Sequence, residues 1–333
     1  MLLSRHTKRR EFITGLGNVM AWPLMARAQQ APTLPVVGFL NTAAPDDWAP
    51  NVAAFRQGLS DTGYTEGRNV ALAFRFADYQ YDRLPALALD LVRQGADVIF
   101  ASGGDNSIKA AIAATNTIPI VFTSANDPVA AGYVKSLSQP GGNVTGVAFL
   151  ASALEAKRLE LLHEIDPKAT SVAVLMGPVN PRTESDMREI EGAAKSLALS
   201  VRFVKIRSDD DIIPAFKDIA AHRDNAIHIV THPFFYARSR TLAALAAQAG
   251  LPTTANEREF PTAGGLLSYG ATLRSAYHDA GAYTGRILKG ENPAQLPVQE
   301  STKIELVINL KTAKALGLTV PLTLQGRADE MIE

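Results

Sequence analysis

The chain has 333 residues, of which 47% are hydrophobic and 20% charged, and its 33 basic residues balance its 33 acidic ones. At roughly 150 residues per domain this length suggests two domains, and the composition is that of a folded globular protein. The charge balance excludes a protein-wide basic surface for nucleic acid. The chain contains no cysteine, which excludes disulfides, thiolate metal ligands, cysteine nucleophiles and lipid attachment through an N-terminal cysteine.

Residues 1–28 contain the three parts of an export signal in the usual order. A basic start is followed by a short apolar stretch from Phe12 to Met25 and then by Ala26-Arg27-Ala28. The run at 8–13, with its Arg9-Arg10 pair, resembles the twin-arginine export motif, and we expect cleavage after Ala28. The alternative is a cytosolic tail with a chance Arg-Arg pair. No later run reaches the ~18 apolar residues of a membrane span, so we expect a periplasmic protein without stable membrane insertion.

Strands and helices alternate along the rest of the chain, in two successive runs. The first run predicts strands at 36–40, 70–76, 97–101, 118–123 and 144–149, and helices at 52–61, 84–92 and 107–114. The second predicts strands at 171–176, 201–206, 226–231, 266–268 and 304–308, and helices at 154–165, 183–199, 212–221, 238–249, 276–288 and 311–316. This alternation is typical of parallel sheets with helices on both faces, so we expect an α/β protein with two doubly wound lobes.

The loops after the strands are the expected place for a ligand, because open parallel sheets bind ligands beyond the carboxyl ends of their strands. Each lobe contributes three such loops. Two lobes that present these loops to each other would form a cleft that closes by a hinge motion.

Runs of residues throughout the chain carry a family resemblance. They are residues 9–13, 53–59, 81–88, 118–123, 127–129, 140–147, 157–162, 233–235, 264–270 and 307–318. With them the chain resembles the ABC-transporter substrate-binding family that includes tryptophan- and tyrosine-uptake proteins. Tyr236 and Ala255 depart from the family pattern, in which a short polar residue and an aromatic residue are common at these places. Both positions lie near the expected ligand, whose identity therefore stays open.

The resemblance implies a periplasmic binding protein fold of type I, with two lobes joined by three crossovers around a hinged cleft. We place one lobe at residues 34–148 plus 271–300 and the other at 149–270 plus 301–333. The family implies capture of a small organic solute, an amino acid or an aromatic acid-like compound, and its delivery to a membrane permease. We expect a monomer without cofactor, metal, nucleic acid or catalytic group.

The candidate ligand contacts of the first lobe lie in three loops. The first loop after a strand contains Asn41 and Trp48, whose indole is either a lid over the ligand or part of a surface patch. The next contains Ser102, Gly103, Gly104, Asp105 and Asn106. Its glycines allow close approach, and the helix start offers N–H groups to a carboxylate, although Asn106 or Ser107 can instead simply cap the helix. The third contains Ser124, Asn126 and Asp127, where Asp127 either pairs with an ammonium group or stabilises a turn before Pro128.

The candidates of the second lobe are aromatic and charged. His232, Phe234 and Tyr236 end a strand, and one aromatic of this run is expected to stack on a flat ligand while the others pack under the next helix. His228 and His232 are too far apart on a strand to share a metal ion. Arg258 can clamp a carboxylate and Glu259 can take an amine, or both are simply solvated. Tyr269 is placed at a crossover, where it packs the hinge or faces the ligand.

Three functions fit these patterns. A binding protein without catalysis explains the export signal, the twin lobes and the absence of G-x-S-x-G, H-E-x-x-H and Walker A motifs. A sensory version would dock to a membrane receptor instead of a permease. An exported hydrolase or lyase would use Asp105 or Glu259 as a base, and a cleft carboxylate with a perturbed pKa would favour it. Of these three functions, we expect the first, a solute-binding protein of an ABC transporter.

Overall fold

The computed structural model describes residues 34–178, 183–301 and 303–333. The expected export signal at residues 1–28 lies outside these described residues. In the described part, no helix combines the length and the apolar character that a membrane crossing requires.

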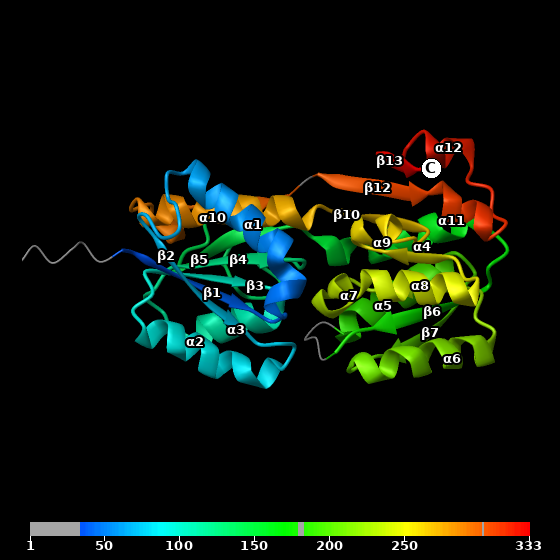
Figure 1. Cartoon of the computed structure of the whole chain (residues 1–333), viewed down its shortest axis with the longest axis horizontal. Helices are drawn as coiled ribbons and strands as arrows, with labels where there is room; N and C mark the ends of the chain where they lie inside the picture. Colours follow the sequence, from blue (N-terminus) through cyan, green and yellow to red (C-terminus); the bar gives the residue numbers. More distant parts are fainter. Residues whose placement is uncertain (1–33, 179–182, 302) are drawn as a thin grey trace, which may run out of the picture. The chain divides into compact units, whose positions relative to one another are not determined.

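The first sheet has six strands, all paired in parallel (Figure 1). Their order is β11 (Gln299–Glu300), β5 (Val144–Ala148), β4 (Ile120–Ser124), β3 (Val98–Ser102), β1 (Val36–Asn41) and β2 (Ala71–Phe76). Every residue of β3, β4 and β5 is buried, as expected for strands that are covered on both faces.

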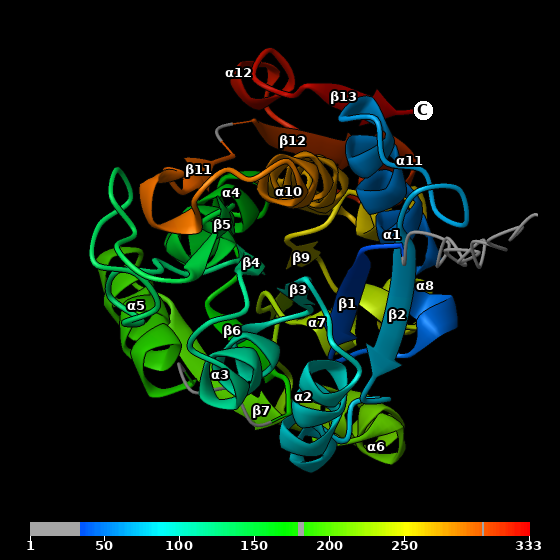
Figure 2. The same ribbon diagram turned by 90° about the vertical axis from the view of Figure 1, so that its left-hand side faces the viewer.

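Helices cover both faces of this sheet (Figure 2). On one face, α1 (Pro45–Asp61) and α10 (Leu273–Leu288) pack over a cluster that includes Phe39, Phe55 and Phe100. On the other, α2 (Leu84–Arg93) and α3 (Asp105–Ala114) pack over a second cluster. The crossing of α1 and α10 requires glycine, because a Cβ atom on Gly58 would lie 1.8 Å from the carbonyl oxygen of His278.

The second sheet has seven strands. Their order is β13 (Glu330–Ile332), β12 (Ile304–Asn309), β10 (Leu267–Ala271), β9 (Thr253–Ala255), β8 (Ala226–Ile229), β6 (Ser171–Met176) and β7 (Ser200–Lys205). The longer helices that pack on it are α4 (Glu155–Ile165), α5 (Thr183–Ser196), α6 (Ile212–His222) and α8 (Ser239–Ala249). Helix α4 contacts α5, and α6 contacts α8. The shorter α11 (Leu310–Ala315) and α12 (Leu322–Gln325) follow β12.

Three connections join the two sheets. The chain passes from β5 into α4, from β10 into α10, and from β11 into β12. The second sheet differs from the all-parallel expectation in one pair, because β10 and β12 run antiparallel. The connectivity explains this difference: the chain leaves β10 for the elements of the first sheet and returns from them into β12, so the two neighbours run in opposite directions. The result is the two-sheet α/β architecture that the alternating pattern predicted.

Candidate functional site

A cavity lies between the loops that follow the strands of the two sheets. About 740 Å³ of space not filled by protein atoms lies in it, its opening included. What we call the first wall consists of residues on elements of the first sheet: Trp48, Tyr81, Gly103, Gly104, Asp105, Asn106, Thr123, Ala125, Asn126, Leu273 and Tyr277. The second wall consists of Thr231, His232, Pro233, Tyr236, Asn256 and Glu257, and Phe149 and Ser152 line the connection after β5.

The first wall begins with a tight turn between β3 and α3. Gly103 and Gly104 have φ angles of 78° and 114°, in the left-handed region that favours glycine. A Cβ atom on Gly103 would lie 2.7 Å from Asn41 Oδ1, and one on Gly104 would lie 3.5 Å from Pro233 Cγ on the second wall. The turn therefore brings the start of α3 to the cavity.

Asp105 supplies the carboxylate of the first wall. Its side chain is buried, and its Oδ2 atom accepts a hydrogen bond of 2.7 Å from Asn126 Nδ2. Asn126 follows β4, the strand next to β3, so parallel neighbours bring the two residues together. A buried carboxylate on a cavity wall can pair with a cationic group of a ligand.

Aromatic side chains make up much of the apolar lining of the cavity. Trp48 on α1 donates from Nε1 to the hydroxyl of Tyr277 on α10, at 2.6 Å. Its ring also contacts Tyr236 on α7 (Pro233–Ala237), with 4.9 Å between the ring centroids. This contact joins the first wall to the second, and the rings offer flat apolar surface to a ligand.

The second wall carries two titratable side chains with shifted pKa values. Burial raises the pKa of the Glu257 carboxyl to about 7. Burial also lowers the pKa of His232 to about 4, so its ring is neutral near neutral pH. His232 Nδ1 accepts a hydrogen bond from the Phe234 N–H at the start of α7, which requires that neutral form.

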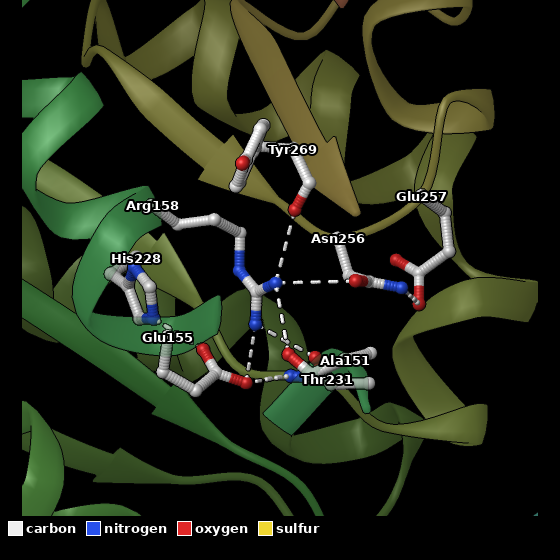
Figure 3. A network of polar contacts seen from close by, with 8 residues as sticks. All are labelled: Ala151, Glu155, Arg158, His228, Thr231, Asn256, Glu257 and Tyr269. Carbon is white, nitrogen blue, oxygen red and sulfur yellow. Dashed lines mark hydrogen bonds and ion pairs between the residues drawn. The ribbon is translucent and has the colours of Figure 1, made fainter. Parts of the chain in front are cut away.

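A buried ion network lies behind the second wall (Figure 3). Arg158 on α4 is fully buried and pairs with Glu155 at 2.5 Å. The other carboxylate oxygen of Glu155 lies 2.7 Å from His228 Nε2, and Arg158 most of all, followed by His228, lowers the pKa of Glu155 to about 2 against the opposing effect of burial. The network contacts the wall through Thr231 and Asn256, which both bond to Arg158.

Half of the residues expected at a ligand line this cavity. They are Trp48, Gly103, Gly104, Asp105, Asn106, Asn126, His232 and Tyr236. Asn41 and Ser102 lie directly behind the first wall, where Asn41 Nδ2 donates to Ser102 Oγ at 2.9 Å and to the Tyr277 hydroxyl at 3.3 Å.

The remaining candidates of the first sheet stabilise a turn. Ser124 Oγ accepts from the Asn126 N–H at 3.1 Å, so its hydroxyl is engaged within its own loop. Asp127 Oδ1 accepts from the N–H groups of Val129 and Ala130, which is the turn-stabilising alternative for this residue. Neither residue lines the cavity.

The remaining candidates of the second sheet also have other partners. Phe234 is buried under Arg238, whose guanidinium lies 3.7 Å from the ring centroid. Arg258 pairs with Glu305 and Glu330, and Glu259 pairs with Arg274. Tyr269, on β10, joins the buried ion network through its backbone oxygen, which accepts a hydrogen bond from Arg158 at 3.1 Å.

Several lining residues were not among the candidate ligand contacts. They are Tyr81, Thr123, Ala125, Phe149, Ser152, Thr231, Pro233, Asn256, Glu257, Leu273 and Tyr277. Ala125 and Pro233 lie between candidates of one loop, and Thr123 and Thr231 directly precede such loops. Counting every loop residue and the residue before each loop would have included all four. Leu273 and Tyr277 lie on α10, a helix that follows a crossover, and no strand-end signal points to it.

Comparison with known proteins identifies the class to which this architecture belongs. Residues 41–332 match the family described as ABC transporter substrate binding protein. A tyrosine-binding protein of Clostridioides difficile is 28% identical over 264 residues, which cover 79% of this chain and 75% of that protein. The chain therefore belongs to the ABC transporter substrate-binding protein family, which is not enzymatic, and it is the solute-binding component of an ABC transporter.

Solved structures share the fold. A conserved domain protein of Vibrio cholerae superimposes with a TM-score of 0.81 at 27% identity, covering 89% of this chain and 99% of that one. A Streptococcus pneumoniae ABC domain in complex with L-Trp gives 0.79 at 22% identity, covering 90% and 100%. These neighbours confirm the two-lobe architecture of type I periplasmic binding proteins. Substrate-binding proteins of this family are extracytoplasmic.

Proposed function

We propose that this chain captures an aromatic amino acid, or a closely similar aromatic acid, in the cavity between the two walls. The observation that carries the proposal is the pairing of one buried carboxylate, Asp105, with the aromatic side chains of Trp48, Tyr236 and Tyr277 around one cavity. A carboxylate favours the ammonium group of an amino acid, and aromatic rings favour a flat side chain. The tyrosine-binding relative supports this class of ligand.

The two-lobe fold supports a cycle of solute capture and delivery. We propose lobes at 34–148 plus 271–300 and at 149–270 plus 301–333, which close on the solute and deliver it as a monomer to a membrane permease. Residues 1–28 would direct the chain to the periplasm by the twin-arginine route. If so, changing Arg9 and Arg10 together to Lys leaves uncleaved precursor in the cytoplasm, whereas a normal periplasmic yield contradicts this route.

Calorimetric titration of the chain without residues 1–28 tests the ligand class. L-Tyrosine and L-tryptophan are the probes, with glucose as a ligand of different chemistry. We expect saturable binding of at least one amino acid and none of glucose. At about 100 times the dissociation constant, the bound solute should also add ~2.7 kcal/mol to the free energy of unfolding. A folded protein that binds neither amino acid contradicts the proposal.

A further inference from the structure

Arg158 is a fully buried cation that does not itself line the cavity. Its Nη2 atom contacts Glu155 Oε1 at 2.5 Å and Thr231 Oγ1 at 2.8 Å. Its Nη1 atom donates to Asn256 Oδ1 and to the backbone oxygen of Tyr269, both at 3.1 Å. A guanidinium group has donors and no acceptor, so each of these partners must present an oxygen lone pair to it.

This requirement determines the orientation of two polar side chains on the second wall. The Asn256 amide must turn its oxygen to Arg158, which places its NH₂ group on the opposite side, toward Glu257 (Figure 3). The Thr231 hydroxyl uses a lone pair on Arg158, so its hydrogen stays available for another acceptor. Both residues line the cavity. The buried cation thus turns an amide and a hydroxyl into hydrogen-bond donors.

We infer that the second wall binds the carboxylate of the solute through the Thr231 hydroxyl and the Asn256 amide NH₂ group, with Arg158 as the positioning residue that makes both of them donors. This inference rests on the proposed function, because it assumes a solute with a carboxylate. It reverses the assignment that the helix start suggested. The start of α3 carries Asp105, whose negative charge repels a carboxylate and attracts an ammonium group.

The two ends of an amino acid would then lie on opposite walls. The ammonium group lies at Asp105 and the carboxylate at Thr231 and Asn256, so full binding energy requires both walls to contact the same molecule. A solute with this polarity favours the closed arrangement of the walls over an open one, since only the closed form makes both sets of contacts.

Glu257 is the acidic group that opposes a carboxylate on this wall. Its Oε1 atom lies 3.4 Å from Asn256 Nδ2, a distance at which it engages one of the two amide hydrogens weakly and leaves the other available. The raised pKa of Glu257 means that a large fraction of its carboxyl groups are protonated near neutral pH, which reduces the repulsion. The charge of Arg158 lowers the pKa of Glu257 against the larger effect of burial, and the charge of Glu259 adds to the rise.

Matched ligands with and without a carboxylate test the inference. Calorimetry gives the dissociation constants of L-tyrosine and of its decarboxylated amine, tyramine, or of L-tryptophan and tryptamine where that amino acid binds tighter. The measured quantity is the ratio of the amine's dissociation constant to that of the amino acid. For the wild type we expect this ratio to be well above one, because tyramine lacks the group that the second wall binds.

Asn256→Asp is the sharpest variant. It keeps an oxygen acceptor for Arg158 but replaces the NH₂ donor with a second carboxylate oxygen. We expect the affinity for the amino acid to fall roughly 10- to 150-fold, as for a lost hydrogen bond to a charged group, while the amine binds as well as before or better. Thr231→Val should also lower the ratio by roughly 10- to 150-fold, because its hydroxyl donates to the same charged carboxylate. Arg158→Lys keeps the positive charge but not the planar guanidinium group, which bonds to Asn256 and Thr231 through two different nitrogens. It should therefore lower the ratio as well.

Asn225→Asp is the matched control. Asn225 Oδ1 also accepts hydrogen bonds, from Thr170 and Ser171, but the residue lies at the opposite end of β8 and outside the cavity. The same change of charge there should leave the ratio unchanged. A ratio near one in the wild type, or an unchanged ratio in folded Asn256→Asp and Thr231→Val, overturns the inference and leaves the proposed function standing. A wild type that binds neither amino acid overturns both.

Discussion

The two walls of the cavity are built in different ways. The first wall comes from turns that directly follow strands, and its polar contacts join residues of neighbouring loops, such as Asp105 and Asn126. The second wall rests on a buried ion network whose members come from α4, β8, β10 and the loops after β8 and β9. The first wall therefore depends on backbone conformation, and the second depends on charges that the protein interior must keep paired.

This difference determines how each wall responds to substitution. A buried ion pair contributes little net stability when intact, but removal of one partner leaves an unpaired buried charge, at a large cost. A substitution in a turn with local hydrogen bonds removes about one hydrogen bond, at a smaller cost in stability. We expect changes behind the second wall to destabilise the protein strongly and changes on the first wall to affect ligand affinity more than stability.

The largest effect is expected for Arg158→Met. It removes the cation while Glu155, only 2% exposed, stays buried and charged, so the free energy of unfolding should fall by about 3–5 kcal/mol. Urea denaturation without ligand measures this change. The double variant Glu155→Gln/Arg158→Met should recover part of the loss, because no unpaired charge remains.

Arg327→Met is the matched control for this prediction. Arg327 also pairs with a carboxylate, that of Glu164, but the two side chains are 47% and 32% exposed. Solvent screens such a pair, so its removal should cost about 1 kcal/mol or less. Equal losses for the two arginine variants would contradict the distinction between the walls.

The next effect is a pH dependence that comes from Glu257. In the folded protein this carboxyl keeps its proton up to about pH 7, whereas its ordinary pKa is 4.5. Between these values the folded state binds more protons than the unfolded state. Stability should therefore fall as the pH rises from about 4.5 to 7, by about 3 kcal/mol in total, and level off above that.

Glu257→Gln should remove this slope, and the difference between the two denaturation curves over pH isolates it. The comparison is needed because His232 acts in the opposite direction. Its pKa is lowered to about 4, so the folded state loses stability as the pH falls from 6.5 toward 4. Parallel curves for the wild type and Glu257→Gln would show that Glu257 titrates normally.

The same difference between the walls explains what could be predicted from the sequence. Alternating strands and helices predicted the two sheets, and the strand-end rule found Gly103 to Asn106 because the whole turn is contiguous in the chain. The ion network behind the second wall could not be found this way. Arg158 looks like an ordinary helix residue, and its role depends on Thr231 and Asn256, which lie 73 and 98 positions away in the sequence. Arg258 and Glu259 were expected at the ligand because they are charged residues at the end of a strand. In the structure, each pairs with another charged side chain instead.

Among changes to the first wall, Asp105→Asn should have the largest effect on ligand binding. It removes the charge expected to pair with the solute's ammonium group, so affinity for L-tyrosine should fall by about 1.5–3 kcal/mol. Asp127→Asn is the control, since Asp127 stabilises an exposed turn outside the cavity. Calorimetric titration of both variants measures the difference. If Asp127→Asn weakens binding as much as Asp105→Asn does, the cavity assignment is wrong.

The smallest effect is expected for Ser124→Ala, which tests whether a hydrogen bond next to the first wall, but outside the cavity, acts on stability alone. The Ser124 hydroxyl accepts from the Asn126 N–H and lies 3.1 Å from the Asn126 carbonyl oxygen, so it supports the loop that carries Asn126. Its loss should cost ~0.5–1.5 kcal/mol of unfolding free energy, the net value of a neutral hydrogen bond. Affinity for L-tyrosine should stay within about a factor of two, because the hydroxyl does not line the cavity and Asn126 keeps its bond to Asp105. Thermal denaturation and titration of the same preparation give both quantities. A variant of wild-type stability that binds more weakly would instead place the hydroxyl on the solute, and the first wall would then extend further along β4 than its lining residues indicate.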